Sequence, residues 1–194
     1  MLALDDKLIQ GLQERNADRK RATAGGTHPR KPVPPVRAKD LHATERGLGF
    51  KIPELLRAAY TKVGAGGFGP GYGIIGGKGA LQCCYEVMLE HQEQNAVWRW
   101  PRRLLPVADY GCGMYSCVDC EYKTLPMILW DPNNLGEDLG GSEARRNWGN
   151  AFWDQGLSLR TWFEGWLEGR GEPEPKWPFD SWMRRRLGFA WPRE

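Results

Sequence analysis

Three short apolar runs lie close together in residues 104–131, and they constrain the fold more than any other feature of this chain. The runs read LLPVA, MYSCVDC and PMILW, and the breaks between them hold glycine or polar residues. Short apolar runs with such breaks are typical of antiparallel strands joined by tight turns. The segment therefore predicts a small antiparallel sheet that crosses the centre of the domain.

Apolar residues recur at helical spacing on both sides of this segment. The clearest case is 158–168, where Ser158 can cap a helix whose apolar side chains form one stripe. The same spacing predicts helices elsewhere in the chain, over residues 2–18, 38–49, 53–63 and 80–95.

Charge is spread unevenly along the 194 residues. Lys and Arg outnumber Asp and Glu by 9 to 5 in residues 1–43 and by 6 to 4 in 169–194, whereas 44–168 has 12 basic and 15 acidic residues. A mildly acidic body argues against a nucleic-acid partner. We predict an N-terminal helix and basic Pro-rich linker (1–37), one domain (38–169), and an aromatic, basic extension (170–194) that packs on the domain.

The first twenty residues are charged, and no run of apolar residues approaches the length of a membrane span. The chain has five cysteines. These features predict a cytoplasmic protein with reduced thiols and no membrane partner.

Three cysteines, Cys112, Cys117 and Cys120, form the sharpest metal-ligand pattern, C-x4-C-x2-C. Zinc or an iron–sulfur cluster needs several thiolates that converge on one point. If 114–121 is one strand, Cys117 and Cys120 point to opposite faces. The interpretation as buried, small apolar side chains is therefore favoured over a metal site.

Asp109, Asp119 and Asp131 could form the carboxylate site of a hydrolase, but Asp109 and Asp131 adjoin turns, where Asp is favoured for local hydrogen bonds. The Gly-rich run 64–79 follows a predicted helix, whereas a dinucleotide-binding loop follows a strand. We expect no enzyme activity, no cofactor and no small-molecule ligand; a metal- or carboxylate-dependent hydrolase is the weaker alternative.

The order of segments resembles the SUKH superfamily (SMI/KNR-like domains). The residues that carry the resemblance are LHATERGLGFKIPELLRAAYTKVGAGG (41–67), LLPVADYGCGMYSCVDC (104–120), PMILWDPN (126–133) and SLRTWFEGWLE (158–168). The resemblance implies a single α+β domain in which helices flank a mainly antiparallel sheet of about four to six strands. It also implies a protein without catalytic residues.

Bacterial members of this superfamily act largely as immunity proteins in polymorphic toxin systems, and fungal members regulate cell-wall synthesis. The resemblance therefore implies an immunity protein that binds a cognate toxin domain and occludes it. A regulatory or scaffold interaction domain is the alternative. The helix at 80–90 and the segment 134–150 depart from the family pattern, so the choice of partner can differ.

Acidic loop residues and aromatic anchors are what an inhibitory surface would use. On that basis we predict partner contacts at five residues: Trp98, Trp100, Glu137, Asp138 and Glu143. Solvated loop acids and buried Trp residues explain the same pattern equally well.

Overall fold

The computed structural model contains the antiparallel sheet that residues 104–131 predict, and a fourth strand extends it. The sheet has the order β1-β2-β3-β4, and each neighbouring pair is antiparallel. Its strands are β1 (Leu104–Gly111), β2 (Met114–Asp119), β3 (Pro126–Trp130) and β4 (Phe152–Ser158). The structure describes residues 3–18, 20–22, 33–76, 79–93, 99–134, 149 and 151–170.

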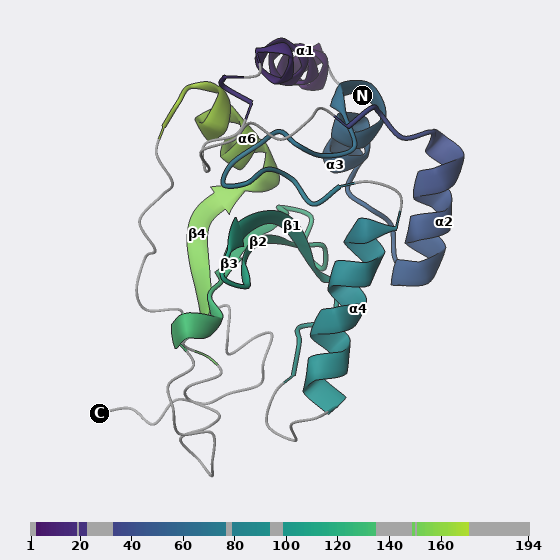
Figure 1. Ribbon diagram of the computed structural model, residues 1–194, viewed down its shortest axis with the longest axis vertical. Coiled ribbons are helices and arrows are strands. Elements are labelled where there is room, and N and C mark those ends of the chain that lie inside the picture. The colour runs from purple at the N-terminus through teal and green to yellow at the C-terminus, as the bar shows by residue number, and fades with distance from the viewer. Residues whose placement is uncertain are drawn as a thin grey trace.

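Helices flank this sheet, so the α+β fold is confirmed with four strands (Figure 1). Helix α4 packs on β1 and beside α2, whereas α6 packs on β3 and β4 and contacts α1. The bounds are α1 (Ala3–Ala17), α2 (Ala38–Leu48), α3 (Glu54–Ala58), the π-helix η1 (Ala59–Val63), α4 (Ala80–Glu93), the 3-10 helix η2 (Pro132–Asn134) and α6 (Leu159–Leu167). In the described part of the chain, no helix combines the length and apolar character that a membrane crossing requires.

The Gly-rich run lies along the free edge of β1. Ile74 and Ala108 form an isolated antiparallel bridge, and the Ile75 N–H donates to the Val107 carbonyl at 2.8 Å. A Cβ at Gly76 would lie 1.5 Å from the Ala65 carbonyl oxygen, so only glycine allows this close approach. The run thus covers backbone groups of β1 and pairs with this strand through a single bridge.

A buried carboxylate fixes the corner between α2 and α3. Helix α2 ends at Gly49, whose φ of 75° is in the left-handed region. The Glu45 side chain turns back into this corner, where it is 5% exposed. It accepts hydrogen bonds from the Ile52 N–H at 3.0 Å, the Lys51 Nζ at 3.2 Å and the Arg57 guanidinium. Burial acts to raise the pKa of Glu45, but these bonds outweigh it and lower the pKa overall.

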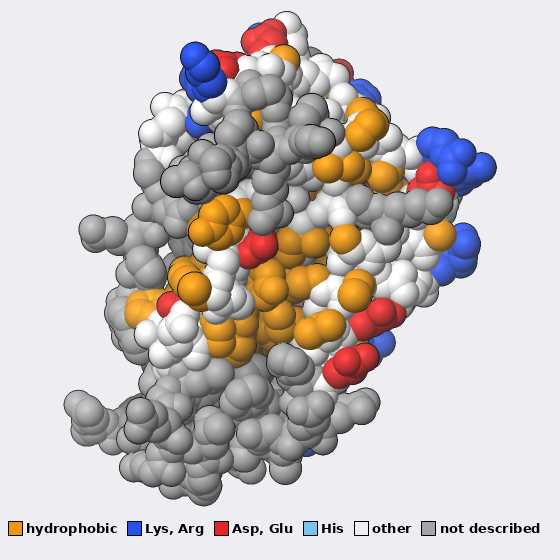
Figure 2. Space-filling view, in the orientation of Figure 1, with side chains coloured by type: hydrophobic (Ala, Val, Ile, Leu, Met, Phe, Trp, Pro, Cys, Tyr) orange, Lys and Arg blue, Asp and Glu red, His pale blue; other side chains and the backbone are white. Residues whose placement is uncertain are grey.

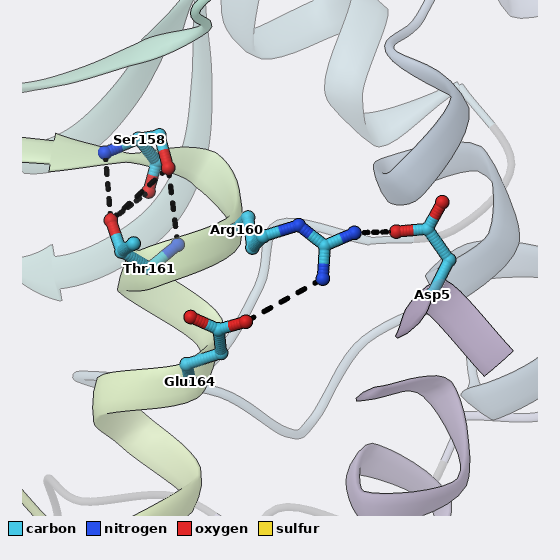
Figure 3. A network of polar contacts seen from close by, with 5 residues as sticks. All are labelled: Asp5, Ser158, Arg160, Thr161 and Glu164. Carbon is cyan, nitrogen blue, oxygen red and sulfur yellow. Dashed lines mark hydrogen bonds and ion pairs between the residues drawn. The ribbon is translucent and has the colours of Figure 1, made fainter. Parts of the chain in front are cut away.

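Contacts of charged side chains hold both ends of helix α1 against α6. Near its start, Asp5 pairs with Arg160, which also reaches Glu164 at 3.5 Å (Figure 3). Near its end, the Arg15 guanidinium lies 4.3 Å from the centre of the Trp166 ring and donates to the carbonyl oxygens of Trp166 and Leu167. These carbonyls belong to the last turn of α6, where a cation is favoured.

Helix α6 itself begins with a capping box. The Ser158 hydroxyl accepts from the Thr161 N–H, and the Thr161 hydroxyl accepts from the Ser158 N–H (Figure 3). This confirms the capping role that the sequence predicts for Ser158. The apolar stripe of α6 is also confirmed, because Leu159, Trp162, Phe163 and Trp166 are buried.

Replacing Glu45 by Gln should lower the free energy of unfolding by about 1–3 kcal/mol at neutral pH, because the charged hydrogen bond with Arg57 is lost inside the protein. A carboxylate with a lowered pKa stabilises the fold above its unfolded value of 4.5, and this contribution disappears as the pH falls through the folded pKa. Urea denaturation at a series of pH values measures this effect. The difference in the free energy of unfolding between the wild type and the variant should become smaller below about pH 4.5. Glu90→Gln, at an exposed position, is the control.

Replacing Arg15 by Ala should lower the free energy of unfolding by about 1–3 kcal/mol, because two carbonyl contacts and the Trp166 stacking are lost together. Lys7→Ala, at an exposed position on the same helix, should change it by less than about 0.5 kcal/mol. Equal unfolding midpoints for both variants would show that α1 is not held through Arg15.

Candidate functional site

The three cysteines of the predicted metal pattern occupy different environments. Cys112 is exposed at the turn between β1 and β2, Cys117 is buried within β2, and Cys120 is partly buried. Strand β2 ends at Asp119, so Cys120 lies beyond it and the expected strand over 114–121 is too long. Among the described residues, no three His, Cys, Asp or Glu side chains come together as a metal site.

Burial controls the chemistry of the inner thiols. It raises the pKa of Cys84 to about 11 and of Cys120 to about 12, and it raises the pKa of Cys117 well above its ordinary range. Nucleophilic attack and metal binding both require the thiolate. These three side chains are therefore thiols at neutral pH, and the buried Cys117 acts as an apolar packing group.

The three aspartates each bind the backbone of their own turn. Asp109 accepts from the Gly111 N–H at 2.7 Å, Asp119 from the Glu121 N–H at 3.0 Å and Asp131 from the Asn133 N–H at 3.0 Å. Asp109 pairs with Tyr115 near the start of β2, whereas Asp119 ends that strand. Asp119 is thus four residues along β2 from the position opposite Asp109, about 13 Å in an extended strand. The carboxylates do not converge.

One of the five predicted partner contacts lies within the described residues. Trp100 is 4% exposed, and its indole N–H donates to the Leu104 carbonyl at 2.8 Å. Its ring packs 5.4 Å from Trp130 and 5.6 Å from Phe152, measured between ring centres. In this position Trp100 contributes to the core, which agrees with the alternative interpretation of a buried Trp residue. Trp98, Glu137, Asp138 and Glu143 lie outside the described residues, so their contacts stay predictions.

Helix α4 brings together an exposed surface that the sequence did not single out. Leu81, Tyr85 and Met88 are buried on one side of the helix. On the other side, Val87 is 39% exposed, and Figure 2 shows apolar side chains beside the position of α4 with acidic side chains along the outer edge. We call this surface the α4 face, and it consists of Cys83, Cys84, Glu86, Val87 and Glu90 of α4 together with Tyr115 of β2.

The α4 face combines residues of two elements, α4 and β2. The Cys84 thiol interacts with the Tyr115 hydroxyl, and Asp109 lies near enough to both groups to raise their pKa values. Burial, the Cys84 thiol and Asp109 together raise the pKa of Tyr115 to about 12. The sequence signal for this surface was the absence of Lys and Arg from residues 80–93, combined with an apolar residue, Val87, on the outer side of the helix.

Thiol alkylation of the native protein should follow this burial. Cys83 and Cys112 are exposed and should react first, Cys84 and Cys120 should react slowly, and Cys117 should be protected until the protein unfolds. Mass spectrometry of iodoacetamide-treated protein, with and without denaturant, measures the order. Rapid modification of native Cys117 would contradict the packing of β2.

Comparison with known proteins identifies the family of this chain. No curated protein matches the sequence. The model of the SMI1/KNR4 family (SUKH-1) matches residues 35–148, which is more than half of the chain and includes α2, α4 and the strands β1 to β3. The match confirms the resemblance read from the motifs, and the chain therefore belongs to the SMI1/KNR4 (SUKH-1) family.

Proposed function

We propose that this protein is an immunity protein, which binds a cognate bacterial toxin domain in the cytoplasm and neutralises it by occluding its active site. The match of residues 35–148 to the SMI1/KNR4 family carries the proposal, because this family is known for toxin immunity and its domains are generally non-catalytic. An occluding inhibitor needs complementary shape and charge, and it needs no reactive group.

The chemistry of the described side chains is consistent with a binding role. Burial keeps the inner thiols protonated, and Asp109, Asp119 and Asp131 are each occupied by the backbone of their own turn. His42 is exposed on α2 and lies on a different element from these groups. These observations give a nucleophilic or carboxylate mechanism little support, and they favour recognition as the function.

The charge of the body of the chain, in contrast to that of the basic termini, favours a basic partner. The body of the chain, residues 44–168, carries 12 Lys and Arg against 15 Asp and Glu. Opposite charges on two partners speed their encounter and disfavour wrong pairings. A toxin with a basic surface, such as an enzyme that acts on nucleic acid, would suit this balance.

Co-expression tests the proposal in cells. The toxin encoded beside this protein should arrest growth when expressed alone, and growth should recover when this protein is expressed with it. The two proteins should also elute together in size-exclusion chromatography. If growth stays arrested and no complex forms, the immunity function is refuted; a pulldown dominated by housekeeping proteins would instead favour a regulatory scaffold.

A further inference from the structure

The α4 face is the described surface that is best suited to receive another protein. Val87 and Val33 are the large apolar side chains in the described residues that are substantially exposed, at 39% and 40%. Val33 stands outside any helix or strand, whereas Val87 lies beside Cys83 and Cys84 on α4. An apolar side chain held within such a cluster can enter a pocket on a partner, and one in isolation needs no explanation.

The α4 face is also held rigidly. The Tyr85 ring packs edge-on against Phe50 at 5.4 Å between ring centres, and its hydroxyl accepts from the Arg103 N–H at 3.2 Å. Helix α4 also packs on β1 and beside α2. A surface that is already ordered loses little conformational entropy when a partner binds.

Carboxylates lie on both sides of the apolar side chains of the α4 face. Glu86 and Glu90 are exposed along its outer edge, and Asp109 lies near Cys84 and Tyr115 on the inner edge. Helix α4 has no Lys or Arg among its residues. Figure 2 shows apolar side chains towards the centre and acidic side chains, with basic ones near them, at the edge beside the position of α4. This pattern complements Lys and Arg side chains placed around an apolar one.

We propose that the α4 face is the surface on which the partner docks, and that the partner presents an apolar side chain surrounded by Lys or Arg. The inference rests on the proposed immunity function. It assigns to the toxin a binding surface with an apolar side chain surrounded by Lys or Arg. Val87 fills the centre of the contact, and Glu86 and Glu90 pair with the surrounding cations. The same charges disfavour acidic partners and nucleic acids at this surface.

Binding of an inactivated form of the neighbouring toxin, measured by calorimetry or surface plasmon resonance, tests the docking surface. Val87→Glu should raise Kd at least about 30-fold, because it places a charge in the apolar centre. The double variant Glu86→Lys, Glu90→Lys should raise Kd by about 10- to 100-fold, with a slower association rate whose difference from the wild type shrinks in high salt.

Two variants of matched exposure serve as controls. Val33→Glu alters the other exposed valine, and Glu14→Lys alters an exposed acid on α1, so both should bind within about twofold of the wild type. Circular dichroism and unfolding midpoints check that every variant is folded. In the wild-type complex, alkylation of Cys83 should slow at least about tenfold relative to the free protein, because a docked partner covers it.

The outcomes separate the two proposals. If the wild type binds and the α4 variants bind equally well, or if the controls lose binding as strongly, the docking surface is wrong while the immunity function stands. If the wild type itself neither binds nor protects cells, the immunity function fails and the docking surface fails with it. Loss of binding confined to the α4 variants, with protection of Cys83, supports the inference.

Discussion

The buried centre of the sheet is the constraint on which the rest of the structure depends. Leu105, Val118 and Met127 face one another across β1, β2 and β3, and none of the three is exposed to solvent. Each such side chain contributes about 1.5–3 kcal/mol when it leaves water. A shift of the register by one residue would move the whole row to the other face, so this row also determines the strand pairing.

Covering the sheet requires segments from both ends of the chain. Helix α6 packs on β3 and β4, α1 is clasped to α6 by Arg15 and Asp5, and α4 packs on β1. Helices α1 and α6 lie outside the residues 35–148 that match the family, yet Leu12 and Phe163 belong to the same core. The inner side of α4 is used for this packing, and its outer side stays exposed to solvent.

Local sequence predicted the elements whose pattern is local. Strands β1, β2 and β3 follow from apolar runs between turns, and α2 and α6 follow from their apolar periodicity and from the residues Gly49 and Ser158 at their ends. Strand β4 was missed because Asp154 and Gly156 interrupt its apolar pattern. Its pairing with β3 is irregular as well, since the five residues from Asp154 to Ser158 oppose the three from Ile128 to Pro126. Whether such a segment forms a strand depends on its pairing with the neighbouring strand, and local sequence does not show this.

The site was harder to predict than the fold. Residue type alone drew attention to the cysteines and aspartates, whereas their surroundings make them packing and turn residues. Trp100 was predicted as an anchor, and its position between Trp130 and Phe152 became visible only in three dimensions. Exposure is a property of the packed molecule, so composition alone could not identify Val87, and its position on the outer side of the helix was the remaining signal in the sequence.

The central claim is that this protein acts by occupying a partner and not by chemistry. Titration of the neighbouring toxin's activity with increasing amounts of this protein tests that claim most directly. Occlusion predicts a linear loss of activity that is complete at one equivalent, and full recovery of the toxin when the complex is dissociated. Inactivation of many equivalents of toxin by one equivalent of this protein, or a lasting covalent change in the toxin, would contradict the account.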